Sequence, residues 1–274
     1  RHFPEEVQGD ILINNNIGFL GAKQHRLKED GTGFTTEHVQ DLYVSKDQNF
    51  RPVDLEFAPD GSLYVADWQN ALIGHMQHSA RDPLRDHEHG RIYRVTYPGR
   101  PLVEPAKVDG ASIAGLLENL KLHEYRTRYR TRRELRERDS SEVAAAASAW
   151  AAEQSDDRLK LEALWVTWGA DKIDGDLLRE LLKSGDHRVR AAAVRVARFN
   201  DHNIGNLTKI LSRAANDKHG RVRLEAITAA TYLPKDQGVA VLTIAEAKEA
   251  DEKMAQTIEF AKNVFSGKVA EGEV

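Results

Sequence analysis

The pattern of hydrophobic and polar positions divides the chain into two parts. Over residues 1–101, apolar residues come in short runs or at every second position, which is typical of β-strands. Over residues 109–265, they recur at spacings of three and four, which predicts amphipathic helices. The sequence therefore predicts a β-part, a Pro- and Gly-containing linker over residues 102–108, a helical part, and a flexible tail over residues 266–274.

The clearest β-signal lies between Phe50 and Pro101. Residues 53–57 alternate apolar and polar side chains, as a half-buried strand does. Pro59-Asp60-Gly61 predicts a tight turn, and residues 62–68 predict the returning strand of a hairpin. A polar loop of about twenty residues follows, and residues 90–97 alternate again, so we expect a third strand there.

The N-terminal residues add further short strands. Candidates are residues 10–14, residues 22–27, Phe34 and residues 39–44, with a turn between the second and third. A propeller blade uses four strands in roughly 40–50 residues, so residues 1–101 predict about two blades of a β-propeller. Closed propellers have about four to eight blades. We therefore expect the missing blades in the same, longer protein or in a second chain.

The helical part contains a repeat. Basic tracts that begin amphipathic helices recur at intervals of 30, 30, 33 and 32 residues. The tracts are Arg128-Tyr129-Arg130, Arg158-Leu159-Lys160, Arg188-Val189-Arg190, Arg221-Val222-Arg223 and, more weakly, Lys253-Met254-Ala255. Asp157, Asp186 and Asp217 precede three of them and are expected as N-caps or turn residues. Each unit is a pair of helices with one apolar face each, which predicts stacking into an α-solenoid of about five pairs.

The second helix of each pair carries a family resemblance. Val189-Arg190 with Ala193, and Val222-Arg223 with Ala226, follow the pattern D-x-x-V-R-x-x-A and resemble HEAT and HEAT-like repeats. The resemblance covers about residues 109–265. It implies a region that acts as an interaction scaffold.

The composition and charge of the chain bear on which partners are expected. Of the 274 residues, 41% are hydrophobic and 30% charged, the formal net charge is -4, and there are no cysteines. The small net charge gives no reason to expect a nucleic-acid partner, and no apolar run is long enough to predict a membrane span. The arginine-rich stretch over residues 126–138 is interpreted as a solvated or domain-seating helix rather than a phosphate site, because glutamates are interleaved with it.

Polar candidates for a site are concentrated in the loop after the predicted hairpin. Imidazole and carboxylate groups suit acid–base chemistry or an oxygen and nitrogen metal site. The catalytic candidates are His75, His78, Arg81 and Asp82, and the metal-ligand candidates are Asp86, His87 and His89. The competing interpretation is that the Arg–Asp pairs of this loop only order it and seat it on its neighbours.

A second resemblance covers residues 1–101. The segments FRPVD, PDGSLYVADW and HGRIYRVTYPGRP resemble the last propeller blade of the large membrane-bound dehydrogenase proteins of planctomycetes and verrucomicrobia. Those proteins join a propeller similar to glucose/sorbosone dehydrogenases to HEAT-like repeats and usually a c-type haem domain. The resemblance implies an exported, periplasmic location, pyrroloquinoline quinone and calcium as cofactors, and electron transfer to a c-type cytochrome. The haem motif C-x-x-C-H is absent here, so any haem would lie on a missing segment or a partner.

The same resemblance implies cofactor-binding residues, namely Arg51, Asp54, Asp67 and Trp68. Each also has a structural interpretation, as a strand-opening salt bridge, a hairpin residue or inter-blade packing. Two functions are therefore expected. The first is quinone-dependent oxidation of a sugar or alcohol, for which this chain alone would not be catalytically complete. The alternative is a non-catalytic propeller and HEAT scaffold that binds a glycan or a protein partner in a larger complex.

Overall fold

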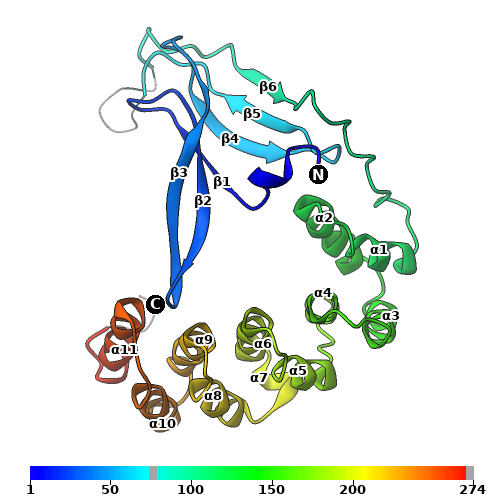
Figure 1. The fold of residues 1–274 in the computed structure, drawn as a ribbon, viewed down its shortest axis with the longest axis vertical. Coiled ribbons are helices and arrows are strands. Elements are labelled where there is room, and N and C mark those ends of the chain that lie inside the picture. The colour runs from blue at the N-terminus through cyan, green and yellow to red at the C-terminus, as the bar shows by residue number, and fades with distance from the viewer. Residues whose placement is uncertain (74–78, 80, 270–274) are drawn as a thin grey trace. The chain divides into compact units, whose positions relative to one another are not determined.

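The computed structural model describes residues 1–73, 79 and 81–269, and it divides the chain into two compact units. The first comprises residues 1–28, 34–107 and 123–127, and the second residues 29–33, 108–122 and the chain from residue 128 onward. Within the described residues the fold is mixed α and β, with two three-stranded antiparallel sheets and eleven α-helices (Figure 1). Neither sheet closes into a barrel in this part of the chain.

The first sheet is a meander in the order β1-β2-β3. Its strands are β1 (Ile11–Asn15), β2 (Gly21–Asp30) and β3 (Gly33–Val44), and a short 3₁₀ helix, η1 (Glu5–Val7), precedes them. Strand β1 pairs with β2 so that Ile11 lies opposite His25. The expected strands over residues 10–14 and 22–27 are confirmed. Phe34 and residues 39–44 belong to one long strand rather than two, because the segment between them has no turn residue.

The second sheet contains the predicted hairpin and the predicted third strand. Its order is β4 (Pro52–Phe57), β5 (Leu63–Asp67) and β6 (Arg91–Val95). Phe57 lies opposite Leu63, and Leu63 lies opposite Val95 in turn. Each sheet therefore has three strands, one fewer than the four that we expected for each blade.

The hairpin turn is held by Asp60. Its carboxylate accepts bonds from the Ser62 amide at 2.9 Å and the Ser62 hydroxyl at 2.6 Å, and it forms an ion pair with Arg94 at 2.5 Å. Gly61 has φ +81°. A Cβ on Gly61 would lie 2.8 Å from the Cβ of His2, so both its backbone angle and its surroundings require glycine.

The core of the first unit is small. Among its described residues, the buried apolar side chains include Ala22, Phe50, Leu63 and Val65, and β1 packs beside β4. His2 is 2% exposed and adds a buried polar bridge. The Tyr97 amide donates to its Nε2 at 2.8 Å, which leaves Nδ1 to donate to the Pro101 carbonyl at 2.9 Å.

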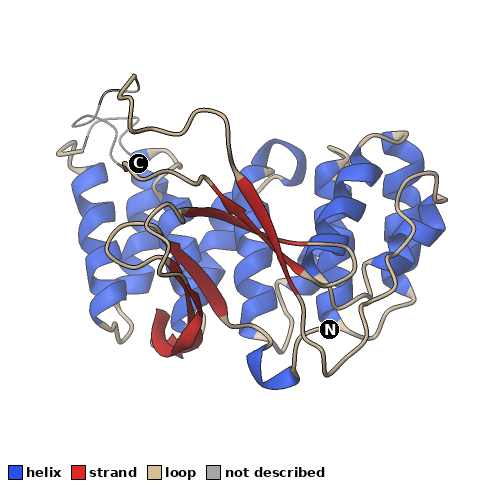
Figure 2. Ribbon diagram, turned by 90° about the horizontal axis from the view of Figure 1, so that it is seen from above, coloured by secondary structure: helices blue, strands red, loops and turns tan. Residues whose placement is uncertain are grey.

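The second unit is built from helices that lie side by side (Figure 2). They are α1 (Ile113–Asn119), α2 (Tyr125–Arg136, shared with the first unit), α3 (Ser140–Ala152), α4 (Asp157–Gly169), α5 (Gly175–Leu181), α6 (His187–Phe199), α7 (Asp201–Ile204), α8 (Leu207–Ala215), α9 (Gly220–Ala230), α10 (Lys235–Glu246) and α11 (Glu252–Phe265). Helices α4, α6, α9 and α11 contact one another in succession. Their apolar faces form one continuous core, as the helical periodicity predicts.

Aspartates at the predicted positions organise the helix starts. Asp186 is the N-cap of α6 and accepts a bond from the Arg188 amide. The prediction for Asp157 is wrong by one residue, because Asp156 caps α4 and Asp157 is the first helical residue. Asp217 is a turn residue that accepts from the His219 amide, while His219 itself occupies the N-cap of α9.

The repeated arginines perform equivalent structural roles. Arg190 donates Nη1 bonds to the carbonyls of residues 184 and 185, and Arg223 donates the same bonds to those of residues 217 and 218. Each guanidinium also reaches the next helix pair, where Arg190 binds the Asp217 carboxylate and Arg223 binds the Glu249 carbonyl. The two arginines, 33 residues apart, therefore each tie one helix pair to the next.

The helical spacing of apolar residues is interrupted at one point. Ile204, Leu207, Ile210 and Leu211 are spaced as on one helix, but Ile204 ends the short α7 and α8 begins at Leu207. Gly205 and Asn206 both have positive φ values, of 59° and 57°. Two consecutive residues in this region cannot continue a right-handed helix, so the chain turns sharply there.

Candidate functional site

Two of the four predicted cofactor residues, Arg51 and Asp67, are buried at the second sheet and bind backbone groups close to it. Asp67 is 3% exposed, and its Oδ1 accepts bonds from the Arg51 amide at 2.7 Å and the Gln69 amide at 2.8 Å. Its Oδ2 lies 3.0 Å from Arg91 Nε in an ion pair without hydrogen-bond geometry. Asp67 thus joins the segment before β4 to the end of β5 and the start of β6.

Arg51 is 5% exposed. Its guanidinium donates to the carbonyls of Phe50 at 3.3 Å and Ala71 at 3.1 Å, while Nε finds no hydrogen-bond acceptor among the described residues. Burial lowers the pKa of Arg51, partly offset by the charges of Asp47 and Asp67. Arg51 therefore ties the start of the loop at Ala71 to the segment that precedes β4.

Asp54 and Trp68 lie at the surface. Asp54 is exposed on β4, and its carboxylate accepts the amide of its neighbour Leu55 at 2.8 Å. Trp68 is 42% exposed, with the guanidinium of Arg85 5.8 Å from its ring centre. The four predicted cofactor residues thus do not converge on one open site, although Arg51 and Asp67 are in contact.

Two of the four predicted catalytic residues, His75 and His78, lie outside the described residues. The other two, Arg81 and Asp82, belong to a turn. The Arg81 amide bonds to the Ser79 hydroxyl at 3.1 Å, and Asp82 accepts the Leu84 amide at 2.9 Å. Asp82 thereby caps its own turn, a common local role for aspartate.

Asp86 and His89 form a carboxylate–imidazole pair on the same loop. His89 Nδ1 lies 3.0 Å from both carboxylate oxygens of Asp86, and Oδ1 also accepts the amides of Glu88 and His89 at 3.0 Å. The Glu88 amide above all, with help from His89, lowers the pKa of Asp86. The imidazole is exposed, and so is His87. Such a pair can position a histidine to accept a proton.

The calcium and quinone that the family resemblance implies remain a prediction. In this part of the chain, no three His, Asp or Glu side chains are close enough together to hold a metal ion. The two arginines beside Asp67 are already engaged: Arg51 bonds a backbone carbonyl, and Arg91 forms ion pairs with Asp47 and Asp67. No step of a reaction is therefore assigned to these groups.

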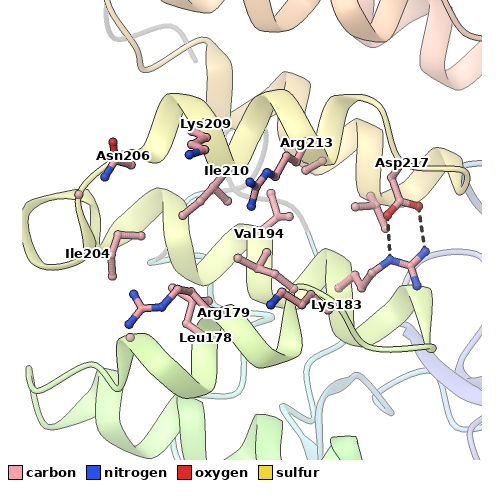
Figure 3. A pocket seen from close by; sticks show the side chains of 16 residues that line it. Leu178, Arg179, Lys183, Val194, Ile204, Asn206, Lys209, Ile210, Arg213 and Asp217 are labelled. Carbon is pink, nitrogen blue, oxygen red and sulfur yellow. Dashed lines mark hydrogen bonds and ion pairs between the residues drawn. The ribbon is translucent and has the colours of Figure 1, made fainter.

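A different cavity lies within the second unit, between α5, α6, α7 and α8. It has a volume of about 320 Å³. Its walls include the apolar side chains Leu178, Val194, Ile204 and Ile210, which come from all four helices (Figure 3). The break at Gly205 and Asn206 separates Ile204 from Ile210, so the local chain geometry shapes one end of the cavity.

Basic side chains surround this apolar lining. Lys209 and Arg213 extend from α8 on one wall, and Arg179 and Lys183 extend from α5 and its C-terminal turn on the other (Figure 3). Arg179 forms an ion pair with Asp176 at 2.6 Å. The other three cations are exposed and have no acidic partner among the described residues. The cavity thus combines an apolar interior with three uncompensated positive charges.

Among the described residues that line the cavity, Asp217 alone is acidic, and both of its carboxylate oxygens accept hydrogen bonds. Arg190 Nε and Nη2 each donate to its carboxylate at 2.8 Å, which forms a bidentate salt bridge. Burial alone would raise the pKa of Asp217, but the bonds from Arg190 and the His219 amide bring it below its ordinary value. This pair therefore neutralises itself and leaves the positive charge of the rim unopposed.

Comparison with known proteins gives one match. A family model described as "Domain of unknown function (DUF7133)" matches residues 1–99, about a third of the chain. No curated protein and no solved structure matches. Over the described residues, no helix is both long and apolar enough to cross a membrane, as expected from the sequence.

Proposed function

We propose that the chain is a non-catalytic scaffold that binds a protein partner through its helical unit. It would be part of a longer, exported protein in which propeller-type blades are followed by HEAT-like repeats. The observation that carries the proposal is the cavity between α5, α6, α7 and α8, with its apolar walls and its three uncompensated cations. Concave faces of stacked helix pairs are well suited to extended partners.

The repeat bonds of Arg190 and Arg223 support the HEAT-like part of this proposal. Both arginines sit at the same place in their helix pairs and bind the same two turn carbonyls. For the β-part, two consecutive antiparallel sheets support blades of a propeller. Each would obtain its fourth strand from elsewhere in the longer protein or from a second chain.

Site-specific photo-crosslinking in the cells that make the protein tests the scaffold. A photoreactive residue replaces Arg179, whose charge is already paired, and in a matched control it replaces Lys235, which does not line the cavity. We expect an adduct of reproducible mass from position 179 that disappears when Lys209 and Arg213 are changed to glutamate. Equal adducts from both positions, or none from position 179, would refute the scaffold.

A second candidate function is quinone-dependent oxidation of a sugar or alcohol, with electrons passed to a c-type cytochrome. The Asp86–His89 pair favours it, because an exposed imidazole held by a carboxylate can take a hydroxyl proton. The pyrroloquinoline quinone and calcium of this proposal would need groups beyond the described residues. Dye reduction by the full-length protein with quinone, calcium and sugars tests it.

The oxidation proposal predicts that His89→Gln lowers turnover by at least about a hundredfold, the usual contribution of a general base. His87→Gln, on the neighbouring exposed histidine, is the matched control and should leave turnover unchanged. Absence of dye reduction by the wild-type protein would eliminate this candidate and leave the scaffold.

A further inference from the structure

We infer that the cavity of the helical unit recognises an acidic segment of the partner protein, in which carboxylates flank an apolar side chain. This inference rests on the scaffold function proposed above and names the chemistry of the bound segment. Three features of the cavity carry it: the arrangement of its cations, the nature of its walls and its volume.

The cations are arranged in two rows. Arg179 and Lys183 are four residues apart on one wall, and Lys209 and Arg213 are four residues apart on the other. Residues four apart on a helix, such as Lys209 and Arg213 on α8, lie roughly 6 Å apart along its axis. A segment whose own carboxylates repeat at a similar distance would place them near several of these cations at once.

The walls between the two rows are apolar. Leu178 and Val194 are buried, while Ile204 and Ile210 are half-buried and can be covered further by a ligand. A volume of about 320 Å³ is at the lower end of the range for ligand pockets, about 300–1,000 Å³. It therefore suits a single large apolar side chain with neighbouring backbone rather than a whole helix.

The spread of charge favours a peptide over a small amphiphile. A fatty acid has one carboxylate at one end and would engage one or two cations, leaving the others without a counter-charge. An acidic segment can compensate Lys183 on one wall and Lys209 and Arg213 on the other, while its apolar residue fills the space between them. Electrostatic complementarity of this kind selects partners and accelerates their association.

Fluorescence anisotropy on the full chain tests the inference. The probe is a labelled synthetic peptide in which glutamates repeat at every fourth position around a central leucine. We expect saturable binding that weakens as salt is added, because the contacts involve exposed charges. The same peptide with glutamine in place of glutamate should bind at least about tenfold more weakly, since it has the same shape and no charge.

Charge reversal locates the site. Lys209→Glu with Arg213→Glu should weaken binding of the acidic peptide by about tenfold to thirtyfold, because two attractions become repulsions. Lys235→Glu with Lys268→Glu changes the net charge equally at two exposed positions that do not line the cavity. This control pair should retain binding within about twofold. Circular dichroism melts of both variants check that the fold is unchanged.

Three results would overturn the inference. The first is equal weakening by the two charge-reversal pairs, which would indicate general attraction to a basic surface. The second is equal binding of the glutamate and glutamine peptides. The third is binding of dodecanoate, used as a small-amphiphile probe, without binding of the acidic peptide. If the crosslink at position 179 persists while the peptide fails, the scaffold stands and only the acidic segment is wrong. If the crosslink is absent, the proposed function fails whatever the peptide does.

Discussion

The pair between Arg190 and Asp217 is the interaction of the helical unit whose removal has the most predictable effect. Arg190 is 7% exposed and donates two bonds of 2.8 Å to the Asp217 carboxylate. Its Nη1 also donates to the carbonyls of Ser184 and Gly185 at 2.8 and 3.2 Å. Arg190→Met keeps a long apolar stem but removes all four bonds.

The expected cost follows from what the substitution leaves behind. Breaking a buried ion pair from one side costs about 3–5 kcal/mol, because the other charge stays buried without its partner. Asp217 has a side chain 14% exposed and still accepts the His219 amide, so some compensation remains. We therefore expect a loss at the lower end of that range, about 3 kcal/mol, in the free energy of unfolding.

Urea unfolding of the full chain at neutral pH, followed by helical circular dichroism, measures this loss. Arg188→Met is the matched control, because Arg188 also pairs with an aspartate, Asp186, at 2.7 Å, but its side chain is 70% exposed. Exposed pairs contribute about 0–1 kcal/mol, so this variant should lose less than about 1 kcal/mol. If the two variants lost equal stability, burial would not decide the strength of these pairs and the reasoning would be wrong.

Two further predictions concern the pH dependence and the hairpin turn. Burial, and then the facing ring of His187 at a centroid distance of 3.5 Å, lower the pKa of His219 below its ordinary 6.5. The unfolded chain then binds a proton on this histidine more readily than the folded chain, so stability is lost as pH falls from about 6.5 through the folded pKa. His219→Asn keeps an N-cap acceptor but has no imidazole. Its melting temperature should therefore fall less than that of the wild type between pH 7 and pH 5. Gly61→Ala should destabilise the first unit by about 1–3 kcal/mol in urea unfolding, because φ is +81° and the new Cβ meets His2. Gly9→Ala, in the same unit with φ +87° and open space around it, isolates the backbone part of that cost, and an equal loss in both variants would show that the contact with His2 adds nothing.

Local signals in the sequence determined most of the secondary structure. Alternation and the Pro59-Asp60-Gly61 turn predicted the β4–β5 hairpin, because short-range backbone preferences fix a tight turn whatever surrounds it. The three- and four-residue spacing predicted the helices, since a helix must bury its apolar face. The helix start at Leu207 does not follow from the apolar spacing, because the positive φ values of Gly205 and Asn206 depend on how the chain turns there.

The candidate site was less predictable. The family resemblance implied Arg51 and Asp67 as cofactor-binding residues, with structural roles as the alternative, and in the fold they bond nearby backbone groups. The sequence does not distinguish a buried structural arginine from a ligand-binding one. Only the tertiary structure shows which hydrogen-bond acceptors the guanidinium can reach. The cavity cations were missed for the same reason. The one local signal of an unpaired cation is that Lys209 has no acidic residue three or four positions away with which it could pair on a helix.

The sequence by itself therefore determined which segments form strands and helices and that a unit of about 30 residues repeats. Those properties depend on backbone preferences and on the period of apolar side chains, which are local. The tertiary structure alone decided that Arg190 neutralises Asp217 while Lys183, Lys209 and Arg213 surround an apolar cavity without a counter-charge. Such a charge balance arises from residues about thirty positions apart, and only the packing of successive helix pairs brings them together.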